Sequence, residues 1–395
     1  MSIRYLEDLS VHERRVFLRV DFNVPYDSAG EIRDDSRIRE ALPTIRYLLE
    51  RKARLILASH WGRPQGRDPA ASLLPVGQHL SELLDQEVFF PEDCIGDGVR
   101  KLAHELKAGQ VLLLENLRFH PGEEANDADF SKKLAAFADL YVSDAFGTLH
   151  RAHASTVGMT VHFKEKGAGF LIRKELEALR PLLAQPAAPF VAVLGGAKVA
   201  DKIGFIENLI GRVNSLLLGG ALAYSFLRVK GRETGRSRVD EERLYLAERV
   251  LKKAAERQVG IYLPADHKVI FENDLGGATS FAVHREIPEG GIGVDIGPET
   301  LAAYRKVLAE AKTVFWNGPM GYFENPLFAE GTFEVARAIA RPGVMSVVGG
   351  GESIAACRQA GVAESISHLS TGGGASLEFL EGKILPGLKA LEVAA

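Results

Sequence analysis

The chain has 395 residues, which is long for a single hydrophobic core, so we expect two domains. An apolar content of 46% and a charged content of 25% are ordinary for a globular protein, and the net charge of −4 argues against general affinity for nucleic acid or acidic membranes. The N-terminus lacks the apolar core of a signal peptide, and no apolar run approaches a membrane span. Two cysteines, Cys94 and Cys357, indicate a reducing compartment. We therefore expect a cytoplasmic protein and, with no exposed apolar stripe recognisable, a monomer.

In the first half, apolar runs that look like buried strands alternate with helical segments, which is typical of an α/β protein with parallel sheets. The runs, each with the motif at its end, are Arg15–Val20 (RVDFNVP), Arg54–Ala58 (SHWGRP), Val111–Leu114 (ENLRFHPGEE) and Leu140–Val142 (SDAFGTLHRAHAS). Ligands of open α/β sheets bind beyond the carboxyl ends of the strands, so we expect these loops to meet at one edge.

Arginine is the feature that these loops share. The arginines concerned are Arg19, Arg37, Arg63, Arg118 and Arg151. Arg37 lies in a predicted helix that runs through Tyr47 and is capped by Asp35 or Ser36. Guanidinium groups match carboxylate and phosphate bidentately, so the set predicts a ligand with several negative oxygens. The alternative is that each arginine belongs to a structural ion pair, with Asp21, Glu115 or Asp144 as partner.

Three histidines belong to the same loops. His150 and His153 are three residues apart and could hold a metal, but no third histidine or cysteine follows at useful spacing. We expect His60 or His153 to donate a hydrogen bond to an anion, and His150 to be structural.

The segment from Lys164 to Gln185 is the predicted boundary between two lobes, and within it FLIRKELEALRPLLAQ (Phe170–Gln185) carries apolar residues at helical spacing. It predicts a helix of about four turns that links two lobes.

The second half opens with the run Phe190–Leu194, followed by Gly195 and Gly196. We expect a strand, a sharp turn and a helix whose first turn presents Lys198 and Lys202 on one face. A helix N-terminus and two ammonium groups would suit a polyphosphate. The alternative is a tight turn with solvated lysines. The chain has neither a Walker A loop nor a G-x-G-x-x-G fingerprint.

Further turns of this kind follow, separated by a charged amphipathic helix at Glu241–Gln258. The segments that carry them are Ser215–Leu227, Ile261–Leu263, Val294–Thr300, Thr313–Glu324, Ser346–Ser353 and Ser370–Phe379. Glycines and apolar residues replace the arginines of the first half, as adenine and a backbone-bound phosphate chain would require. Tight strand-to-helix connections alone are the alternative.

Seven motifs in order resemble those of phosphoglycerate kinase. They are RVDFNVP, SHWGRP, LENLRF, DAFGTLHRAHAS, LGGAKVADKIG, VFWNGPMGYFE and STGGGASLEFLEG, and they extend from Arg19 to Gly382. The resemblance implies two Rossmann-like lobes with parallel sheets, joined by an interdomain helix. The implied boundaries are a phosphoglycerate-binding lobe at 1–170 joined by the tail 378–395, a helix at 171–186, and a nucleotide-binding lobe at 187–377. It also implies hinge bending and reversible transfer of the acyl phosphate of 1,3-bisphosphoglycerate to MgADP in glycolysis, giving 3-phosphoglycerate and MgATP.

Site residues follow from the matching positions. The resemblance implies that phosphoglycerate is held by Asp21, Asn23, Arg37, His60, Arg63, Arg118 and Arg151, with Arg19 in support. The implied catalytic residues are Arg37, Lys198 and Gly373. The implied nucleotide-binding residues are Lys202, Gly219, Gly220, Pro319, Glu324, Gly350, Gly351, Glu352 and Ser353, with Gly372 and Gly374 along the phosphates. Mg²⁺ would accompany the nucleotide.

Three positions depart from the family pattern. Glu352 replaces the aspartate expected to bind Mg²⁺, Trp61 replaces a leucine beside His60, and Tyr322 replaces a smaller residue near the expected adenine pocket. Two rival functions stay open: an NAD-dependent dehydrogenase, for which GGIGVDIG (Gly290–Gly297) lacks the required spacing, and a binding protein that has lost activity, for which Glu352 is the main support.

Overall fold

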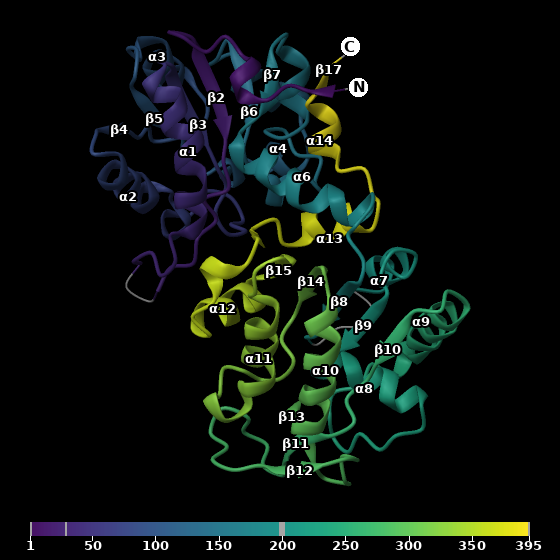
Figure 1. The fold of residues 1–395 in the computed structure, drawn as a ribbon. Helices are drawn as coiled ribbons and strands as arrows, with labels where there is room; N and C mark the ends of the chain where they lie inside the picture. Colours follow the sequence, from purple (N-terminus) through teal and green to yellow (C-terminus); the bar gives the residue numbers. More distant parts are fainter. Residues whose placement is uncertain (1, 28–29, 197–201, 394–395) are drawn as a thin grey trace. The chain divides into compact units, whose positions relative to one another are not determined.

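The framework consists of two six-stranded parallel sheets, one in each of two units of the chain (Figure 1). The computed structural model describes residues 2–27, 30–196 and 202–393. Unit 1 comprises Met1–Leu176 and Ile384–Ala395, and unit 2 comprises Glu177–Lys383. The fold class predicted from the sequence, α/β with two parallel-sheet lobes, is confirmed.

The sheet of unit 1 has the order β4-β5-β3-β2-β6-β7, and all of its neighbouring strands are parallel. Its strands are β2 (Arg15–Arg19), β3 (Arg54–Ala58), β4 (Val88–Phe89), β5 (Val111–Leu113), β6 (Leu140–Ser143) and β7 (Lys166–Ala168). The predicted strands β2, β3, β5 and β6 are consecutive neighbours, so their carboxyl ends share one edge. The short strands β4 and β7 were not predicted, because two or three residues form no recognisable run.

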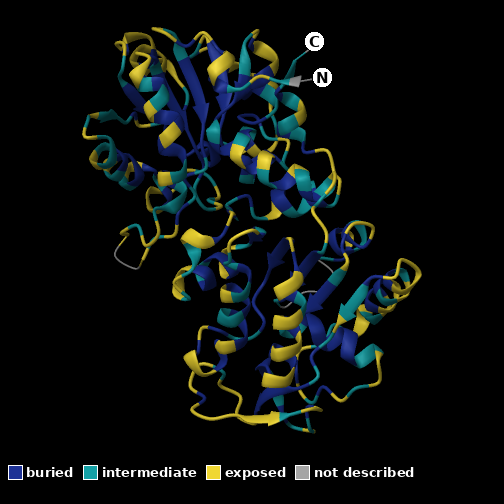
Figure 2. Cartoon of the chain, in the orientation of Figure 1, coloured by how far each residue is buried: buried dark blue, intermediate teal, exposed yellow. Residues whose placement is uncertain are grey.

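Both faces of this sheet are buried, which explains why its strands read as continuous apolar runs (Figure 2). Val16 and Leu18 of β2 belong to a core that includes residues of α1 and α2. Phe17, which points to the other face, stacks on Tyr141 of β6 with ring centroids 6.1 Å apart.

The helices of unit 1 are short apart from α1. They are α1 (Ser36–Glu50), α2 (Leu74–Leu84), α3 (Asp97–Glu105), α4 (Pro121–Glu124), α5 (Ala128–Ala135) and α14 (Pro386–Ala390), with 3₁₀ helices at Leu6–Asp8, Pro69–Ala71, Leu117–Phe119 (η3), Phe146–Thr148 and Gly158–His162. The two ends of the unit pair as antiparallel strands, β1 (Ser2–Ile3) with β17 (Glu392–Val393).

Helix α6 (Phe170–Leu183) contains the division between the units, which falls between Leu176 and Glu177. Its first turn is fixed inside unit 1, because Asp144 Oδ1 accepts hydrogen bonds from the backbone N–H groups of Leu171 (2.9 Å) and Ile172 (3.2 Å). These bonds satisfy donors that a helix start leaves unpaired. The predicted boundaries at residues 170 and 186 stay a prediction.

The sheet of unit 2 has the order β10-β9-β8-β14-β15-β16 and is also parallel. Its strands are β8 (Phe190–Leu194), β9 (Ser215–Leu218), β10 (Gly260–Tyr262), β14 (Thr313–Asn317), β15 (Met345–Gly349) and β16 (His368–Ser370). Its helices are α7 (Ile203–Leu209), α8 (Gly220–Val229), α9 (Leu244–Glu256), α10 (Pro298–Glu310), α11 (Glu330–Ile339), α12 (Gly351–Gln359) and α13 (Gly374–Leu380), with 3₁₀ helices at Glu241–Arg243, Pro326–Phe328 and Ala363–Ser365. The strand, glycine and helix order predicted for most of this half is confirmed.

One segment of the second half differs from the expectation of parallel strands. β13 (Ile292–Ile296) pairs antiparallel with β11 (His267–Ile270), which also pairs with β12 (Ala282–His284) in a separate three-stranded sheet. The strand at Val294–Ile296 was recognisable from its apolar residues. Its antiparallel partner β11 was not, because the direction of pairing is set by distant residues.

One helix start differs from expectation, and a second lies outside the described residues. Asp35 occupies the N-cap position of α1, but its side chain makes no capping bond; it lies 2.9 Å from both Arg39 and His79. The helix predicted directly after Gly196 is described only from its N-cap residue Lys202 onward, because residues 197–201 lie outside the described part of the chain.

Candidate active site

Arg19, the last residue of β2, lies at the centre of the polar loops in unit 1 and is only 1% exposed. Its Nε donates to Ser155 Oγ (2.8 Å), and its Nη2 lies 3.2 Å from His60 Nδ1. Ser155 in turn donates to Glu123 through its hydroxyl (2.5 Å) and its backbone N–H (3.0 Å). The buried guanidinium of Arg19 and the buried carboxylate of Glu123 are both bonded to Ser155. Together with His60 they connect the loops that follow β2, β3, β5 and β6.

Burial and neighbouring arginines keep the two histidines of this site neutral. Burial, with Arg19 and Arg118 adding positive charge, holds the pKa of His60 well below its usual range. The same causes lower the pKa of His153 to about 4. Both imidazoles can therefore exchange hydrogen bonds with a ligand at neutral pH without carrying charge.

Asp21 and Asn23, in the loop after β2, fix two neighbouring groups. Asp21 Oδ2 lies 2.8 Å from Arg37 Nη1 of α1, and Asp21 Oδ1 lies 3.9 Å from His60 Nδ1. Asn23 Oδ1 accepts from the backbone N–H of Gly62 (3.0 Å). The structure therefore brings Asp21, Asn23, Arg37 and His60 together at one edge of the sheet.

Arg118, Arg151 and Arg63 add positive charge to the same edge. Arg118, in η3, lies 3.0 Å from Glu124 and donates to the carbonyl of Gly62. Burial lowers the pKa of Arg118, and the charges of Arg151, Arg19 and Arg63 lower it further although Glu124 opposes them. These guanidinium groups thus lie within electrostatic range of one another, and an anionic ligand would relieve their repulsion.

The alternative interpretation was that each arginine forms a structural ion pair with Asp21, Glu115 or Asp144. It is correct for only part of the set. Arg37 does pair with Asp21. Glu115 instead accepts from the backbone N–H groups of Leu73 and Asn116, and Asp144 accepts from the start of α6. Neither carboxylate is therefore used to neutralise one of the predicted ligand-binding arginines.

Trp61 joins the loop bearing His60 to the loop after β2. Its indole Nε1 donates to the carbonyl of Val24 (2.6 Å), and its ring stacks on Tyr26 with centroids 4.4 Å apart. Its backbone N–H and carbonyl both bond to the side chain of Asn116. The large side chain thus fills the space between two loops of the site.

In unit 2, a cavity of about 400 Å³ lies where the predicted phosphate-binding turns meet. Its lining includes Lys202, Gly350, Gly351, Glu352, Ser353 and Gly373. Lys202 Nζ donates to the carbonyls of Gly195 (2.5 Å) and Asn317 (3.1 Å), which follow β8 and β14. Gly318 has φ +93°, and a Cβ there would lie 2.4 Å from the backbone carbonyl oxygen of Gly195, so the close approach of these two strand-end loops requires glycine.

A second cavity, of about 290 Å³, adjoins the first through Gly196 and Glu352, which line both. Its lining includes Gly220, Pro319, Tyr322 and Glu324. Gly220 has φ +60°, and a Cβ there would lie 2.7 Å from Gly196 N, so the two strand-end loops approach each other by backbone alone. Gly219 packs against Met320, because a Cβ added at Gly219 would lie only 2.5 Å from Met320 Sδ.

Lys198 lies outside the described residues. Glu352, in the first turn of α12, is exposed beside both cavities, so its carboxylate fits the oxygen donors that Mg²⁺ prefers.

Four residues of the site were missed by sequence reasoning. Glu123 and Ser155 belong to motifs that the sequence marked, but only the fold shows that they hold Arg19. Arg238 and Tyr224 line the second cavity from outside the glycine turns. No sequence signal marked Arg238, and within the described ranges it has no ion-pair or hydrogen-bond partner, so its charge is available to a ligand.

Two parallel sheets, with an arginine-rich edge in one unit and glycine turns around cavities in the other, define an α/β protein with sites for anionic ligands. A phosphoglycerate kinase family model matches residues 6–383. Among curated relatives, a phosphoglycerate kinase of Anaeromyxobacter dehalogenans (strain 2CP-C) is 54% identical, covering 99% of this chain and 100% of the relative, and one of Acidobacterium capsulatum is 51% identical, covering 99% of each. The chain belongs to the phosphoglycerate kinase family.

Solved structures agree with this membership. The structure of phosphoglycerate kinase from Coxiella burnetii has a TM-score of 0.88 at 39% identity and covers 99% of both chains. That from Pyrococcus horikoshii OT3 has a TM-score of 0.86 at 38% identity and covers 98% of both. Within the described part of the chain, every helix is too short or too polar to span a bilayer.

Proposed function

We propose that the chain transfers the acyl phosphate of 1,3-bisphosphoglycerate reversibly to MgADP, giving 3-phosphoglycerate and MgATP, as a step of glycolysis. The observation that carries this proposal is the group of arginines beside the neutral His60 at one edge of the unit 1 sheet. A small ligand with a carboxylate and a phosphate supplies the negative oxygens that such a group lacks.

In this proposal the triose acid lies on unit 1. Arg63, Arg118 and Arg151 bind its phosphate and carboxylate oxygens, while His60 and Asn23 orient it. Asp21 holds Arg37 in place at 2.8 Å, so that Arg37 can reach the phosphoryl group that moves. Arg19, buried and bonded to Ser155, supports the loops without touching the ligand.

The nucleotide lies on unit 2. Its phosphates follow the first cavity, along Lys202 and the starts of α12 and α13 at Gly350–Ser353 and Gly372–Gly374. Its base and ribose enter the second cavity, between Gly220, Pro319 and Glu324. Tyr322 adds an aromatic ring and Arg238 a cation to this second cavity, which makes both candidates for setting nucleotide preference.

The reaction demands positioning and neutralisation of charge more than covalent chemistry. An acyl phosphate is already activated, so neither a covalent nucleophile nor a strong general base is needed. Lys198 stabilises the equatorial oxygens during transfer, together with Arg37 and the backbone at Gly373. Mg²⁺, when bound with the nucleotide, would neutralise phosphate charge, and Glu352 is the residue that would hold it, directly or through water.

Transfer requires that the two bound substrates come within about 3–3.5 Å of each other and that water be excluded. We therefore propose that the units close by bending at a hinge, and that full closure needs both substrates. Small-angle scattering of the chain with each ligand alone and then with both tests this step. A smaller radius with both ligands than with either alone is expected; equal compaction by one ligand would reject it. We further propose that the enzyme acts as a monomer, which sedimentation at assay concentration would check.

A coupled assay of ATP formation from MgADP and 1,3-bisphosphoglycerate tests the activity itself. The proposal predicts ATP formation that depends on both substrates and on Mg²⁺. Binding of both substrates without turnover would favour a binding protein that has lost activity. Substrate-dependent reduction of NAD in place of ATP formation would favour a dehydrogenase.

A further inference from the structure

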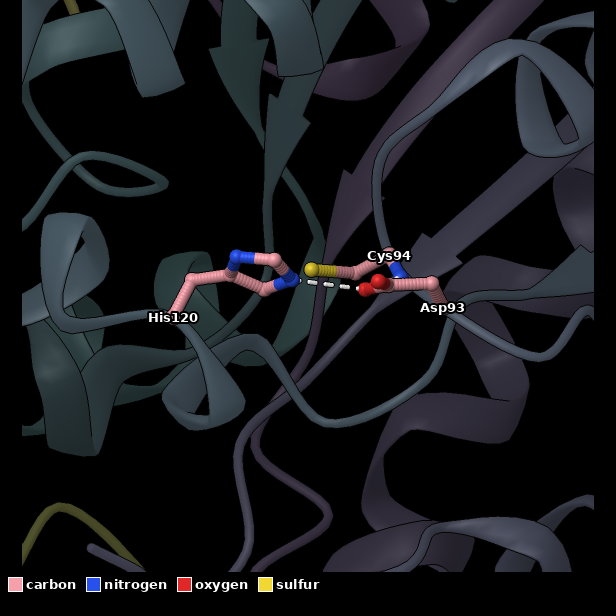
Figure 3. A group of neighbouring side chains, drawn as sticks. All are labelled: Asp93, Cys94 and His120. Carbon is pink, nitrogen blue, oxygen red and sulfur yellow. Dashed lines mark hydrogen bonds and ion pairs between the residues drawn. The ribbon is translucent and has the colours of Figure 1, made fainter. Parts of the chain in front are cut away.

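Asp93, Cys94 and His120 converge in unit 1 (Figure 3). One ligand atom from each side chain, a carboxylate oxygen, the thiol sulfur and an imidazole nitrogen, lies within 4.8 Å of the other two. Asp93 and Cys94 belong to the loop between β4 and α3, whereas His120 lies between η3 and α4. Among the described residues, this is the one group of three histidine, cysteine or acidic side chains whose ligand atoms lie close enough together to hold a metal ion. It includes neither His150 nor His153.

Hydrogen bonding and stacking orient two of these side chains, His120 and Asp93. His120 Nε2 lies 2.7 Å from Asp93 Oδ1, and the His120 ring stacks on Phe130 with centroids 5.3 Å apart. Asp93 Oδ1 also accepts from the backbone N–H of Cys94 (2.6 Å). The three donor atoms are therefore held close together before any ion arrives, which lowers the entropic cost of binding one.

The three groups also differ in their access to solvent. Cys94 is fully buried, whereas the side chains of Asp93 and His120 are 36% and 29% exposed. The site thus has a closed end at the sulfur and an open end at which an ion and a water ligand can enter. Such an arrangement, with three protein ligands and one open position, is found in tetrahedral zinc sites.

We propose that Asp93, Cys94 and His120 form a binding site for a borderline-soft divalent cation of the Zn²⁺ class, with water as the fourth ligand. The thiol proton leaves to solvent as the sulfur–metal bond forms. The proton that His120 Nε2 donates to Asp93 is lost from Nε2 and the ring takes up a proton at Nδ1, so that the neutral imidazole and the carboxylate each form a metal bond in place of their hydrogen bond. This site is distinct from the nucleotide-associated Mg²⁺ of the proposed reaction.

The ligand types separate the two cations. Mg²⁺ prefers oxygen ligands in octahedral geometry and binds thiolate poorly, so it should not compete for a sulfur, nitrogen and oxygen set. The bound ion would also tie the loop of Asp93 to the segment that carries Arg118 in η3, two residues before His120. The inference itself rests on the three side chains and holds whether or not the kinase proposal does.

Cobalt(II) is a suitable probe, because a cobalt–thiolate bond gives an intense charge-transfer band that oxygen and nitrogen ligands do not. The full-length chain, free of nucleotide and reduced with a phosphine, is titrated with Co²⁺ and followed by absorption. The chain has only two cysteines, so Cys357→Ser, in unit 2, is a matched control for Cys94→Ser. Circular dichroism establishes that each variant is folded.

The proposal predicts one Co²⁺ per chain with a charge-transfer band in the wild type and in Cys357→Ser, and no such band in Cys94→Ser. Zn²⁺ should abolish the band, and a large excess of Mg²⁺ should leave it. His120→Gln, at a partly exposed position, should weaken Co²⁺ binding at least about tenfold and provides the test if Cys94→Ser does not fold. No band in the wild type, a band retained in Cys94→Ser, or unchanged affinity in His120→Gln would overturn the proposal.

Discussion

Arg37 Nη1 lies 2.8 Å from Asp21 Oδ2, so a side chain of helix α1 is held by the loop that follows β2. Both side chains are partly exposed, at 37% and 11%, which leaves the guanidinium able to reach a ligand while one of its nitrogens stays bonded. The pair thus positions a cation at the edge of the sheet where His60 and the other arginines lie.

We expect Arg37→Ala to lower kcat by about 10²–10³, because donors that stabilise developing negative charge typically contribute this much. Steady-state kinetics in both directions of the reaction would measure the effect. Arg39→Ala is the matched control: Arg39 lies on the same helix and pairs with Asp35 on the exposed surface, so its removal should leave kcat unchanged. Equal rates for the two variants would exclude Arg37 from the reaction.

Arg63→Ala should raise the KM for 3-phosphoglycerate by roughly tenfold to a hundredfold, which corresponds to the loss of one hydrogen bond to a charged group. Arg63 is exposed at the edge of the site, so its removal should not disturb the core. Arg67→Ala, which removes an exposed arginine of the same loop, should change neither the KM for 3-phosphoglycerate nor the KM for ADP. An effect of Arg63→Ala confined to ADP would contradict the assignment of the triose acid to unit 1.

For Lys198→Ala we expect kcat to fall by at least about two orders of magnitude while nucleotide affinity stays within a few-fold. The reason is that Lys198 is assigned to charge that develops only during transfer. Lys252→Ala, on an exposed position of α9, is the comparison variant. A turnover number that stays at the wild-type value would remove Lys198 from the mechanism.

Asp144 gives a prediction about stability and pH. Burial raises the pKa of its carboxyl to about 7, although hydrogen bonds from Thr44, Ile172 and Leu171 favour the ionised form. Because the folded pKa exceeds the unfolded value of 3.8, the folded chain binds more protons, and this contribution to the free energy of unfolding is lost as pH rises through 7.

The free energy of unfolding of the wild type, measured relative to Asp144→Asn by urea titration, should therefore fall by roughly 2–3 kcal/mol between about pH 5 and about pH 8. Asp295, whose pKa burial also raises to about 7, is present in both proteins and cancels in the difference. A difference that is constant with pH, or that increases, would show that Asp144 is ionised in the folded chain across this range.

Local sequence was sufficient for the longer parallel strands and the loops that follow them. Runs such as Arg54–Ala58 are apolar because both sheet faces are buried, and glycines follow β8 and β9 because backbones approach closely there. These features depend on residues that are close together in the chain, so they can be predicted from one sequence. The motifs also placed the arginines of unit 1 and the glycine turns of unit 2.

Long-range partners could not be predicted in this way. Glu123 contacts Ser155 across 32 positions, and Cys94 meets His120 across 26, without any spacing typical of a ligand motif. Likewise, the antiparallel pairing of β13 with β11 depends on which distant segment lies beside it. In each case the fold, rather than a local pattern, brings the groups together.

Phosphoryl transfer to the carboxylate of 3-phosphoglycerate tests the central claim most directly. The chain is incubated with Mg²⁺, 3-phosphoglycerate and ATP labelled in the γ-phosphate, and the acyl phosphate is measured as labelled product and as the hydroxamate formed with hydroxylamine. We predict labelled acyl phosphate that requires 3-phosphoglycerate and forms about 10²–10³ times more slowly in Arg37→Ala but at the wild-type rate in Arg39→Ala. Release of label only as inorganic phosphate, at a rate independent of 3-phosphoglycerate, would contradict it.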